Sequence, residues 1–212
     1  MRAPAVVRPL SALALVFACA STASAGSLFL EGVGGYQDLT GARDSAKAVF
    51  GSSGGLTFGG GLGYTLANGF FFSEWARHFS KDGERVFVAA PGSPVFPLGH
   101  PLSVTITAIQ GTLGHRFGKG SFKPYVGVGG GLTSFKETST VGGLTESTSQ
   151  SKASYHALAG VDFELGSLCL GGELMYLSVP NSVGLAGVSQ VYGESNVGGF
   201  QAVGKLSFRF GK

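Results

Sequence analysis

The chain has 212 residues, of which 37 are glycine and 13% are charged, and its formal net charge is +3. This length suits a single domain of moderate size, and so small a net charge gives no argument for nucleic-acid binding. The sequence holds no cluster of cysteine and histidine residues typical of a metal site, and we expect neither a metal nor another cofactor.

The N-terminus has the features of a secretory signal peptide. Two arginines precede an apolar run at residues 10–20, and the small residues Ala23 and Ala25 follow at the positions that a signal peptidase prefers. The run is shorter than the ~20 apolar residues of a membrane-spanning helix, and Cys19 lies in a sequence only loosely like a lipoprotein signal. We therefore predict that residues 1–25 are removed and that residues 26–212 form the mature domain. A retained helix and a lipoprotein anchor are the alternatives.

Beyond residue 26 the sequence alternates with period two, which is typical of β-strands whose successive side chains face opposite sides. In residues 54–66, for example, Leu56 and Phe58 share one parity, while Gly59 and Gly61 share the other. No pattern of a long helix interrupts the series. Eight strands are predicted in this way, at 27–37, 54–66, 70–80, 102–117, 123–136, 152–165, 167–178 and 197–210.

The fourth predicted strand, 102–117, is the least regular of the eight. Its apolar parity switches between Ile106 and Ile109. We interpret the switch as a β-bulge or a shifted register.

The glycine-rich stretch 127–131 raises the question of a phosphate-binding loop. Such a loop needs a strand before the glycines and a helix after them. Here Pro124 opens an extended segment, and Leu132 and Ser134 continue the alternation without a helical start. The glycines are therefore predicted to lie within a strand.

The connections between the predicted strands alternate in length. Short ones are expected at 67–69, at 118–122 and around Gly166, and long ones, rich in turn-forming residues, at 38–53, 81–101, 137–151 and 179–196. Hairpins in this order place all short turns at one end of the molecule and all long loops at the other.

Three features favour a membrane barrel over a soluble one. The polar face is rich in small uncharged residues that suit a narrow interior. It also carries charges of both signs, which can pair. Aromatic residues lie near strand ends on the apolar parity, where interfacial girdles belong: Tyr64, Trp75, Phe79, Tyr176, Phe208 and Phe210. The predicted fold is all-β, an eight-stranded antiparallel transmembrane β-barrel with short periplasmic turns and long external loops. A soluble periplasmic barrel that binds a ligand is the alternative.

Ionisable side chains on the predicted interior face form the candidate site. The interior of an eight-stranded barrel is just wide enough for its side chains, and buried charges need partners. We predict a closed interior held by a polar network, with a narrow porin-like channel lined by the same residues as the alternative. The predicted network comprises Glu74, His78, His156, Asp162, Glu164, Glu173, Lys205 and Arg209.

Three stretches carry a resemblance to known proteins: 123–131 (KPYVGVGGG), 170–177 (LGGELMYL) and 204–210 (GKLSFRF). They resemble strands of the small eight-stranded outer-membrane barrels of the OmpA-barrel, OmpX and opacity-protein type, and the likeness extends over about residues 27–210. The last stretch resembles the assembly signal of that family, although its glycine-to-aromatic spacing differs by one and two residues follow Phe210.

The resemblance implies an outer-membrane protein of a Gram-negative bacterium. It implies contact with outer-membrane lipid and lipopolysaccharide, and insertion by the machinery that reads the assembly signal, here Gly204, Phe208 and Phe210. It also implies a structural or adhesion-like role, without catalysis, in which an extracellular surface is a further potential partner.

Some small membrane barrels are lipid A deacylases, and His78-Phe79-Ser80 with the nearby Glu84 has the spacing of their catalytic motif. A histidine that takes the proton of a serine while a carboxylate orients it is sound chemistry. The flanking residues of that family's motif are missing, and the motif lies in the wrong part of the chain. We therefore expect no catalytic residues, and keep a lipid A-modifying enzyme as an alternative.

Apolar residues in the predicted loop 81–101 allow two interpretations: Val86, Phe87, Val88, Val95, Phe96 and Leu98. They form either an adhesive surface, as the opacity-type resemblance implies, or a loop that folds back over the barrel mouth.

Overall fold

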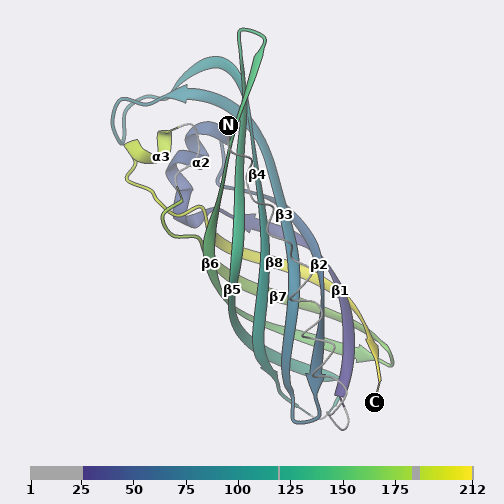
Figure 1. The fold of residues 1–212 in the computed structure, drawn as a ribbon. Coiled ribbons are helices and arrows are strands. Elements are labelled where there is room, and N and C mark those ends of the chain that lie inside the picture. Colours follow the sequence, from purple (N-terminus) through teal and green to yellow (C-terminus); the bar gives the residue numbers. More distant parts are fainter. Residues whose placement is uncertain (1–25, 119, 183–186, 212) are drawn as a thin grey trace, which may run out of the picture.

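The computed structural model describes residues 26–118, 120–182 and 187–211, so the predicted signal peptide lies outside the described residues. Eight antiparallel strands form a closed barrel in which each strand pairs with the next and β8 pairs with β1 (Figure 1). This confirms the predicted fold class. The strands are β1 (Gly26–Asp38), β2 (Gly54–Leu66), β3 (Phe70–Phe87), β4 (Phe96–Arg116), β5 (Phe122–Val141), β6 (Leu144–Leu165), β7 (Leu168–Ser178) and β8 (Gly199–Phe210).

Within the described ranges, three short helical segments accompany the strands: η2 (Thr40–Ala42), α2 (Arg43–Phe50) and α3 (Val188–Val191). In the described ranges, no helix has the length and apolar character needed to span a membrane. Figure 1 shows α2 and α3 at one end of the barrel, which we call the loop end. The other end, the turn end, holds the end of β8 and the short connections at 67–69, at 166–167 and at the described residues 117, 118, 120 and 121.

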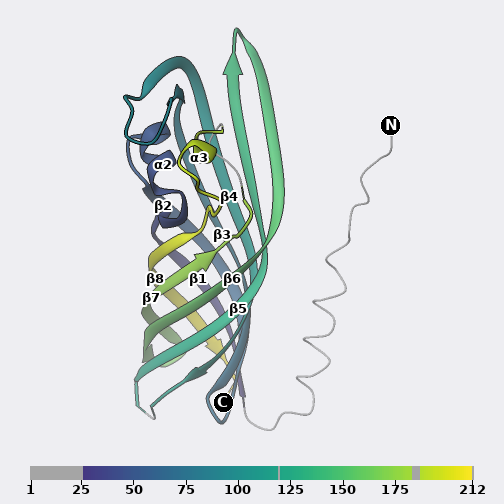
Figure 2. The same ribbon diagram turned by 90° about the vertical axis from the view of Figure 1, so that its left-hand side faces the viewer.

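Two of the four expected long loops are mostly strand. β3 and β4 continue through much of 81–101, and β5 and β6 continue through 137–151 to a two-residue turn at Gly142 and Gly143. Both turn glycines have positive φ, 57° and 82°, which a tight hairpin of this kind requires. The β5–β6 hairpin therefore projects beyond the rest of the loop end (Figure 2).

The apolar residues of β4 change from the outer to the inner face part-way along the barrel, although the same alternate positions face inward throughout. Toward the turn end, Ile109 and Leu113 of β4 point outward and are exposed. Toward the loop end, β4 turns Leu102, Val104 and Ile106 inward, where all three are buried, and the threonines and serine between them point outward. An apolar outer face suits lipid, whereas an apolar interior beneath a polar outer face suits water. The turn-end half is thus the part built for the membrane.

The bulge expected in the fourth strand is absent. β4 keeps one register with both neighbours from Leu102 to Arg116. The register shift between β3 and β4 lies nearer the loop end, where β4 has three residues, 98–100, opposite the single residue 85 of β3. The switch of apolar parity near Ile106 reflects the change of surroundings from lipid to water.

The glycine-rich stretch lies within β5, as predicted, and its inward glycines let β5 approach β4 closely. A Cβ atom added to Gly129 would overlap the carbonyl oxygen of Gly111 and come 2.6 Å from the ring of His156. Gly111 itself faces outward, and a Cβ there would meet its nearest neighbour at 3.9 Å. The two glycines therefore form a matched pair for mutation.

Gly129→Ala should destabilise the barrel by about 1–3 kcal/mol, because backbone atoms must move to admit the methyl group. Gly111→Ala should leave the free energy of unfolding close to that of the wild type. Urea unfolding in detergent micelles, followed by the fluorescence of the single tryptophan Trp75, measures both. Equal effects at the two positions would contradict the assigned faces of β4 and β5.

Candidate functional site

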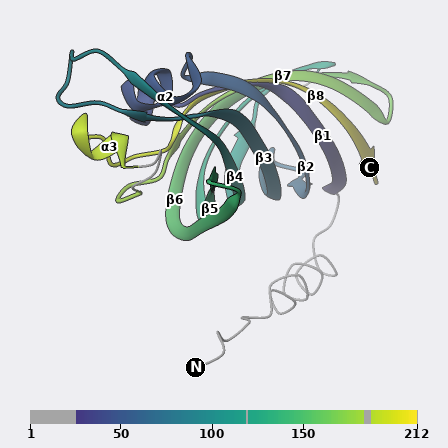
Figure 3. The ribbon, with the colours of Figure 1, turned by 90° about the horizontal axis from the view of Figure 1, so that it is seen from above.

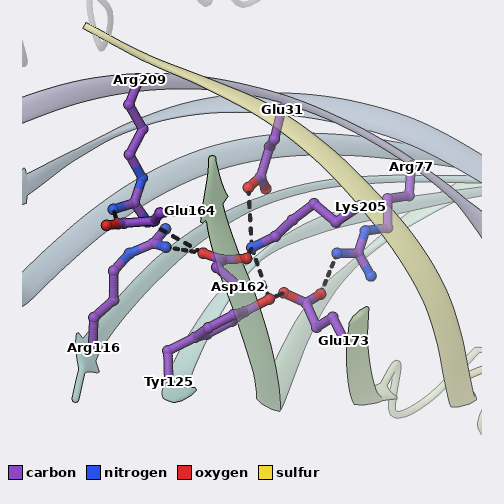
Figure 4. Close-up of polar contacts among 9 residues, drawn as sticks. All are labelled: Glu31, Arg77, Arg116, Tyr125, Asp162, Glu164, Glu173, Lys205 and Arg209. Atoms are coloured by element: carbon purple, nitrogen blue, oxygen red, sulfur yellow. Dashed lines mark hydrogen bonds and ion pairs between the residues drawn. The ribbon is translucent and has the colours of Figure 1, made fainter. Parts of the chain in front are cut away.

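The turn-end half of the barrel encloses a network of charged side chains, which we call the interior ladder. Figure 4 shows its nine members: Glu31, Arg77, Arg116, Tyr125, Asp162, Glu164, Glu173, Lys205 and Arg209. They come from all the strands except β2, and they face one another across the lumen. The ladder therefore ties together strands that share no backbone hydrogen bonds.

Asp162 is the centre of the first part of the ladder. Its fully buried carboxylate forms ion pairs with Arg116, with Lys205 at 2.9 Å and with Arg209 at 3.3 Å. Arg209 also pairs with Glu164 nearer the turn end. One carboxylate on β6 thus neutralises cations from β4 and β8.

Glu173 is the centre of the second part. One oxygen pairs with Arg77 from the far side of the barrel, and the other accepts a hydrogen bond from the hydroxyl of Tyr125 at 2.9 Å. The Tyr125 oxygen in turn accepts one from Lys205 at 2.8 Å, which joins the two parts. Because the Arg77 and Glu173 side chains are only 2% and 4% exposed, each depends on the other for charge compensation.

Aromatic rings complete the surroundings of the cations. The guanidinium carbon of Arg116 lies 4.8 Å from the ring centre of Phe29 and 5.0 Å from that of Phe71, and Arg77 lies 4.5 Å from the ring centre of Trp75. Such contacts favour a cation over the face of a ring. The interior therefore binds its own cations with both carboxylates and rings.

A neutral chain of hydrogen bonds lies next to the ladder. The indole of Trp75 donates to the hydroxyl of Thr112 at 2.9 Å, and His156 lies 2.9 Å from that hydroxyl through Nε2 and 3.1 Å from the side-chain oxygen of Gln110 through Nδ1. Because the Thr112 oxygen accepts the indole proton, the Thr112 hydroxyl can donate its own proton to Nε2 of His156. A neutral imidazole that carries its proton on Nδ1 then accepts from Thr112 and donates to Gln110. The amide of Gln110 donates onward to Ser154 at 2.6 Å.

The structure brings together five of the predicted network residues in the ladder: Asp162, Glu164, Glu173, Lys205 and Arg209. His156 lies inside but belongs to the neutral chain. Sequence reasoning missed Glu31, Arg77, Arg116 and Tyr125. The signal of Arg77 was weak, because it shares a parity with Trp75 and Phe79, which we expected to face lipid.

The predicted inward orientation of Glu74 and His78 is wrong. Both alternate with the buried Trp75 and Arg77 and therefore lie on the outer face of β3. The His78 ring lies 5.2 Å from the ring of Phe58, which is 61% exposed. Trp75 and Phe79, which we expected in an outer girdle, are correspondingly buried inside, because the lumen needs their volume and their ring faces.

The potential catalytic group does not assemble. The Nδ1 atom of His78 contacts the hydroxyl of Thr107 at 3.2 Å, and Glu84 accepts a hydrogen bond from the backbone of Gly99 at 2.5 Å. In the described part of the chain, no hydrogen bond joins His78 to Ser80 or to Glu84. The same residues contain no group of His, Cys, Asp and Glu able to hold a metal ion.

A known family shares this architecture. Residues 10–179 match the family described as outer membrane protein beta-barrel domain. The chain belongs to this family. It is accordingly an outer-membrane β-barrel of the Gram-negative type, with the short turns on the periplasmic side and the loop end outside.

Solved structures of outer-membrane proteins have the same fold as this chain. A major outer membrane protein from Thermus thermophilus has a TM-score of 0.61 at 10% identity, and covers 88% of this chain and 100% of its own. Neisserial surface protein A, from Neisseria, has a TM-score of 0.55 at 14% identity, with the same coverage of 88% and 100%. Comparison with curated proteins gave no match. At these identities the likeness concerns the fold alone.

The external end of this outer-membrane barrel carries a folded cap, formed by 39–53 and by the described parts of 179–198. Its buried residues Leu39, Ala46 and Val188 belong to the same apolar cluster as Ile106 and Leu177, which lie in the loop-end half of the barrel. Seen from above, α2 and α3 lie on the same side of the external end (Figure 3). The interior is thus polar on the periplasmic side and apolar beneath the cap.

Glu194 joins the two halves of the cap. Its carboxylate accepts hydrogen bonds from the backbone of Asp44 at 2.9 Å and of Ser45 at 3.0 Å, at the N-terminus of α2. These backbone donors have no partner within the helix, and a negative charge there also suits the helix dipole. A residue 149 positions away in sequence therefore fixes the start of α2.

Asp38 anchors the other side of the cap, where β1 ends. It accepts hydrogen bonds from Ser53 and, at 2.8 Å, from Arg43. Partial burial raises the pKa of the Asp38 carboxyl, but these two hydrogen bonds, together with the positive charges of Arg43 and Lys47, outweigh burial and hold that pKa below its ordinary value.

The cap is expected to loosen as the pH falls below about 4. Because the pKa of Asp38 is lower in the folded than in the unfolded chain, its stabilisation is complete above the unfolded value and is lost as the pH falls through the folded one. The mobility of a spin label at the exposed position 47 measures the loosening. Asp38→Asn should remove most of the pH dependence; an unchanged pH profile in this variant would contradict the assignment.

Proposed function

We propose that this outer-membrane barrel is a non-conducting, non-enzymatic protein whose structural or surface-interaction role is carried out by its external end. The observation that supports the proposal is the set of side chains in the lumen. The ladder fills the periplasmic half with charges that neutralise one another, and the apolar cluster under the cap fills the external half. Ions crossing the barrel would have to break both.

The external hairpins supply the surface for such a role. Phe87, Val95, Phe96 and Leu98 of the β3–β4 hairpin are exposed, whereas Val86 and Val88 of the same hairpin are buried beneath it. The exposed residues suit an adhesive surface, and the two buried ones suit a segment that folds back over the barrel mouth. The contacts with lipopolysaccharide, and the reading of Gly204, Phe208 and Phe210 by the insertion machinery, belong to the same proposal; the two phenylalanines face outward and are exposed.

Planar-bilayer recording tests closure. Purified protein should insert without stepwise openings at moderate voltage, measured beside an open porin as a positive control. Steady openings in most insertions would favour the narrow-channel alternative and overturn the proposal.

A second measurement tests the orientation of the surface. A cysteine placed at Gly142, at the tip of the β5–β6 hairpin, should react in intact cells with a maleimide that cannot cross the membrane. Labelling only after cell lysis would place the hairpin on the periplasmic side and remove the basis for a surface role.

A further inference from the structure

The periplasmic end of the barrel holds a pocket of about 780 Å³, which we call the mouth pocket. Its volume lies within the range of about 300–1,000 Å³ that is usual for sites of small molecules. The connections 67–69 and 166–167 and the ends of β4 and β8 line it. Among its described lining residues, the charged ones are Arg116, Lys123, Glu164 and Arg209. Three cations thus accompany one carboxylate.

The four charged side chains come from four strands. Arg116 ends β4, Lys123 and Glu164 lie on the paired strands β5 and β6, and Arg209 lies near the end of β8. Figure 4 shows the guanidinium groups of Arg116 and Arg209 approaching the carboxylates of β6 from opposite sides. The ammonium of Lys123 lies 3.5 Å from an oxygen of Glu164. The cations are therefore gathered at one place in the mouth pocket.

The carboxylates inside the barrel do not balance these cations. Within the ladder, the basic side chains equal the carboxylates in number, and Lys123 adds a further basic side chain at the mouth pocket. Asp162 is shared by three cations, and Glu164 is shared by Arg209 and Lys123. Among the described residues inside the turn-end half, one positive charge therefore remains without a counter-charge.

The two arginines also have hydrogen-bond donors that the protein leaves unused. The Nε atoms of Arg116 and Arg209 are buried, and within the described ranges neither has an acceptor. A guanidinium has five N–H donors, and Arg209 uses its two terminal nitrogens on Glu164 and Asp162. Because a buried donor without an acceptor is costly, a further acceptor at this place would stabilise both arginines.

A carboxylate suits the chemistry of the mouth pocket. Guanidinium groups bind carboxylates through paired, charge-assisted hydrogen bonds, and Lys123 adds a flexible ammonium. One carboxylate supplies the single negative charge that is lacking. A phosphate monoester carries about −1.5 to −2 at pH 7, and its excess charge would lie beside Asp162 and Glu164. The apolar residues Leu66 and Phe117 also line the pocket and are 39% and 45% exposed, so the ligand should have an apolar part.

We propose that the mouth pocket binds a small organic monocarboxylate from the periplasm. Arg116, Lys123 and Arg209 hold its carboxylate. Its apolar part lies against Leu66 and Phe117. Binding needs no open path through the barrel, because the pocket lies at the periplasmic end. The proposal goes beyond the proposed function, since a barrel that acts through its external end needs no ligand on the periplasmic side.

A pair of matched ligands tests the proposal on the full mature chain in micelles of an uncharged maltoside detergent. N-acetylphenylalanine is titrated while the backbone amide signals are followed by NMR. The signals of 66–69, 117–118 and 166–167 should shift and saturate, while those of the external hairpins stay in place. N-acetylphenylalaninamide, which has the same shape without the charge, should bind at least about tenfold more weakly. Inorganic phosphate should also bind at least about tenfold more weakly.

Variants at Lys123 test which charge is responsible. Lys123→Met removes the surplus charge and should weaken binding at least about tenfold, whereas Lys123→Arg should keep most of the affinity. Glu164 retains Arg209 as a partner in both variants, so the fold should be preserved. Lys47→Met makes the same change of charge on exposed α2 and should bind like the wild type.

Three results would overturn the proposal. The first is a titration in which the turn-end signals do not saturate. The second is an amide or a phosphate that binds as tightly as the acid. The third is a Lys123→Met variant that binds the acid as tightly as the wild type does.

Discussion

Replacing Asp162 with alanine is expected to destabilise the barrel by about 3–5 kcal/mol, the usual cost of leaving buried charges without their partner. The side chain is fully buried and holds Arg116, Lys205 and Arg209 together. Among the described residues, its loss leaves these cations with only Glu164 and Glu31 within ion-pair distance. The free energy of unfolding in urea, followed by Trp75 fluorescence, measures the effect.

Asp82→Ala is the matched control, because Asp82 is an exposed aspartate on β3. It should change the free energy of unfolding by less than ~0.5 kcal/mol. The double variant Asp162→Ala/Lys205→Met should be less destabilised than Asp162→Ala alone, because it also removes one of the cations that lost its ion-pair partner. A cost for Asp162→Ala no larger than that of the control would show that the ladder does not hold the barrel together.

Glu173→Ala is expected to have a similarly large effect, about 3–5 kcal/mol. It leaves Arg77 buried with the side chain of Gln201, at 3.0 Å, as its remaining polar partner, and it removes the acceptor of the Tyr125 hydroxyl. Chemical denaturation in the same micelles measures the loss.

The double variant Arg77→Met/Glu173→Leu separates charge from packing. Apolar replacement of a whole buried pair is often neutral or stabilising, so this variant should recover most of the stability lost in Glu173→Ala. A double variant less stable than the single one would mean that the pair contributes more than mutual neutralisation, and would contradict the account given for Arg77.

Period-two alternation was sufficient to predict the strands, their antiparallel order and the short turns, because each of these depends on neighbouring residues. The strand extensions that form the long external hairpins were not predicted, because their sequences lack an apolar face. Residues 144–154 are mostly Ser and Thr, which lack an apolar face because water surrounds both sides of the projecting hairpin. Their strand pairing shows in the structure but not in any hydrophobic pattern.

The interior was harder to predict, because a barrel lumen is neither uniformly polar nor uniformly apolar. β3 carries Phe71, Trp75 and Phe79 inside together with Arg77, while Glu74 and His78 lie outside. What places Arg77 inside is Glu173, 96 residues away and across the barrel. Such long-range pairing cannot be read from the alternation within one strand, so only residues on strands with a plain polar face, such as Asp162 and Lys205, were predicted well.

The most direct test of this account is the accessibility of spin labels along β4. Single cysteines are placed from 102 to 113 in a Cys169→Ser background, in lipid bilayers, and probed with oxygen for lipid and with a water-soluble nickel complex for water. We expect labels at Ile109 and Leu113 to be exposed to lipid, those at Thr105 and Thr107 to water, and those at Val104 and Ile106 to neither. Water access at Val104 and Ile106 would show an open lumen and contradict the closed, two-environment barrel.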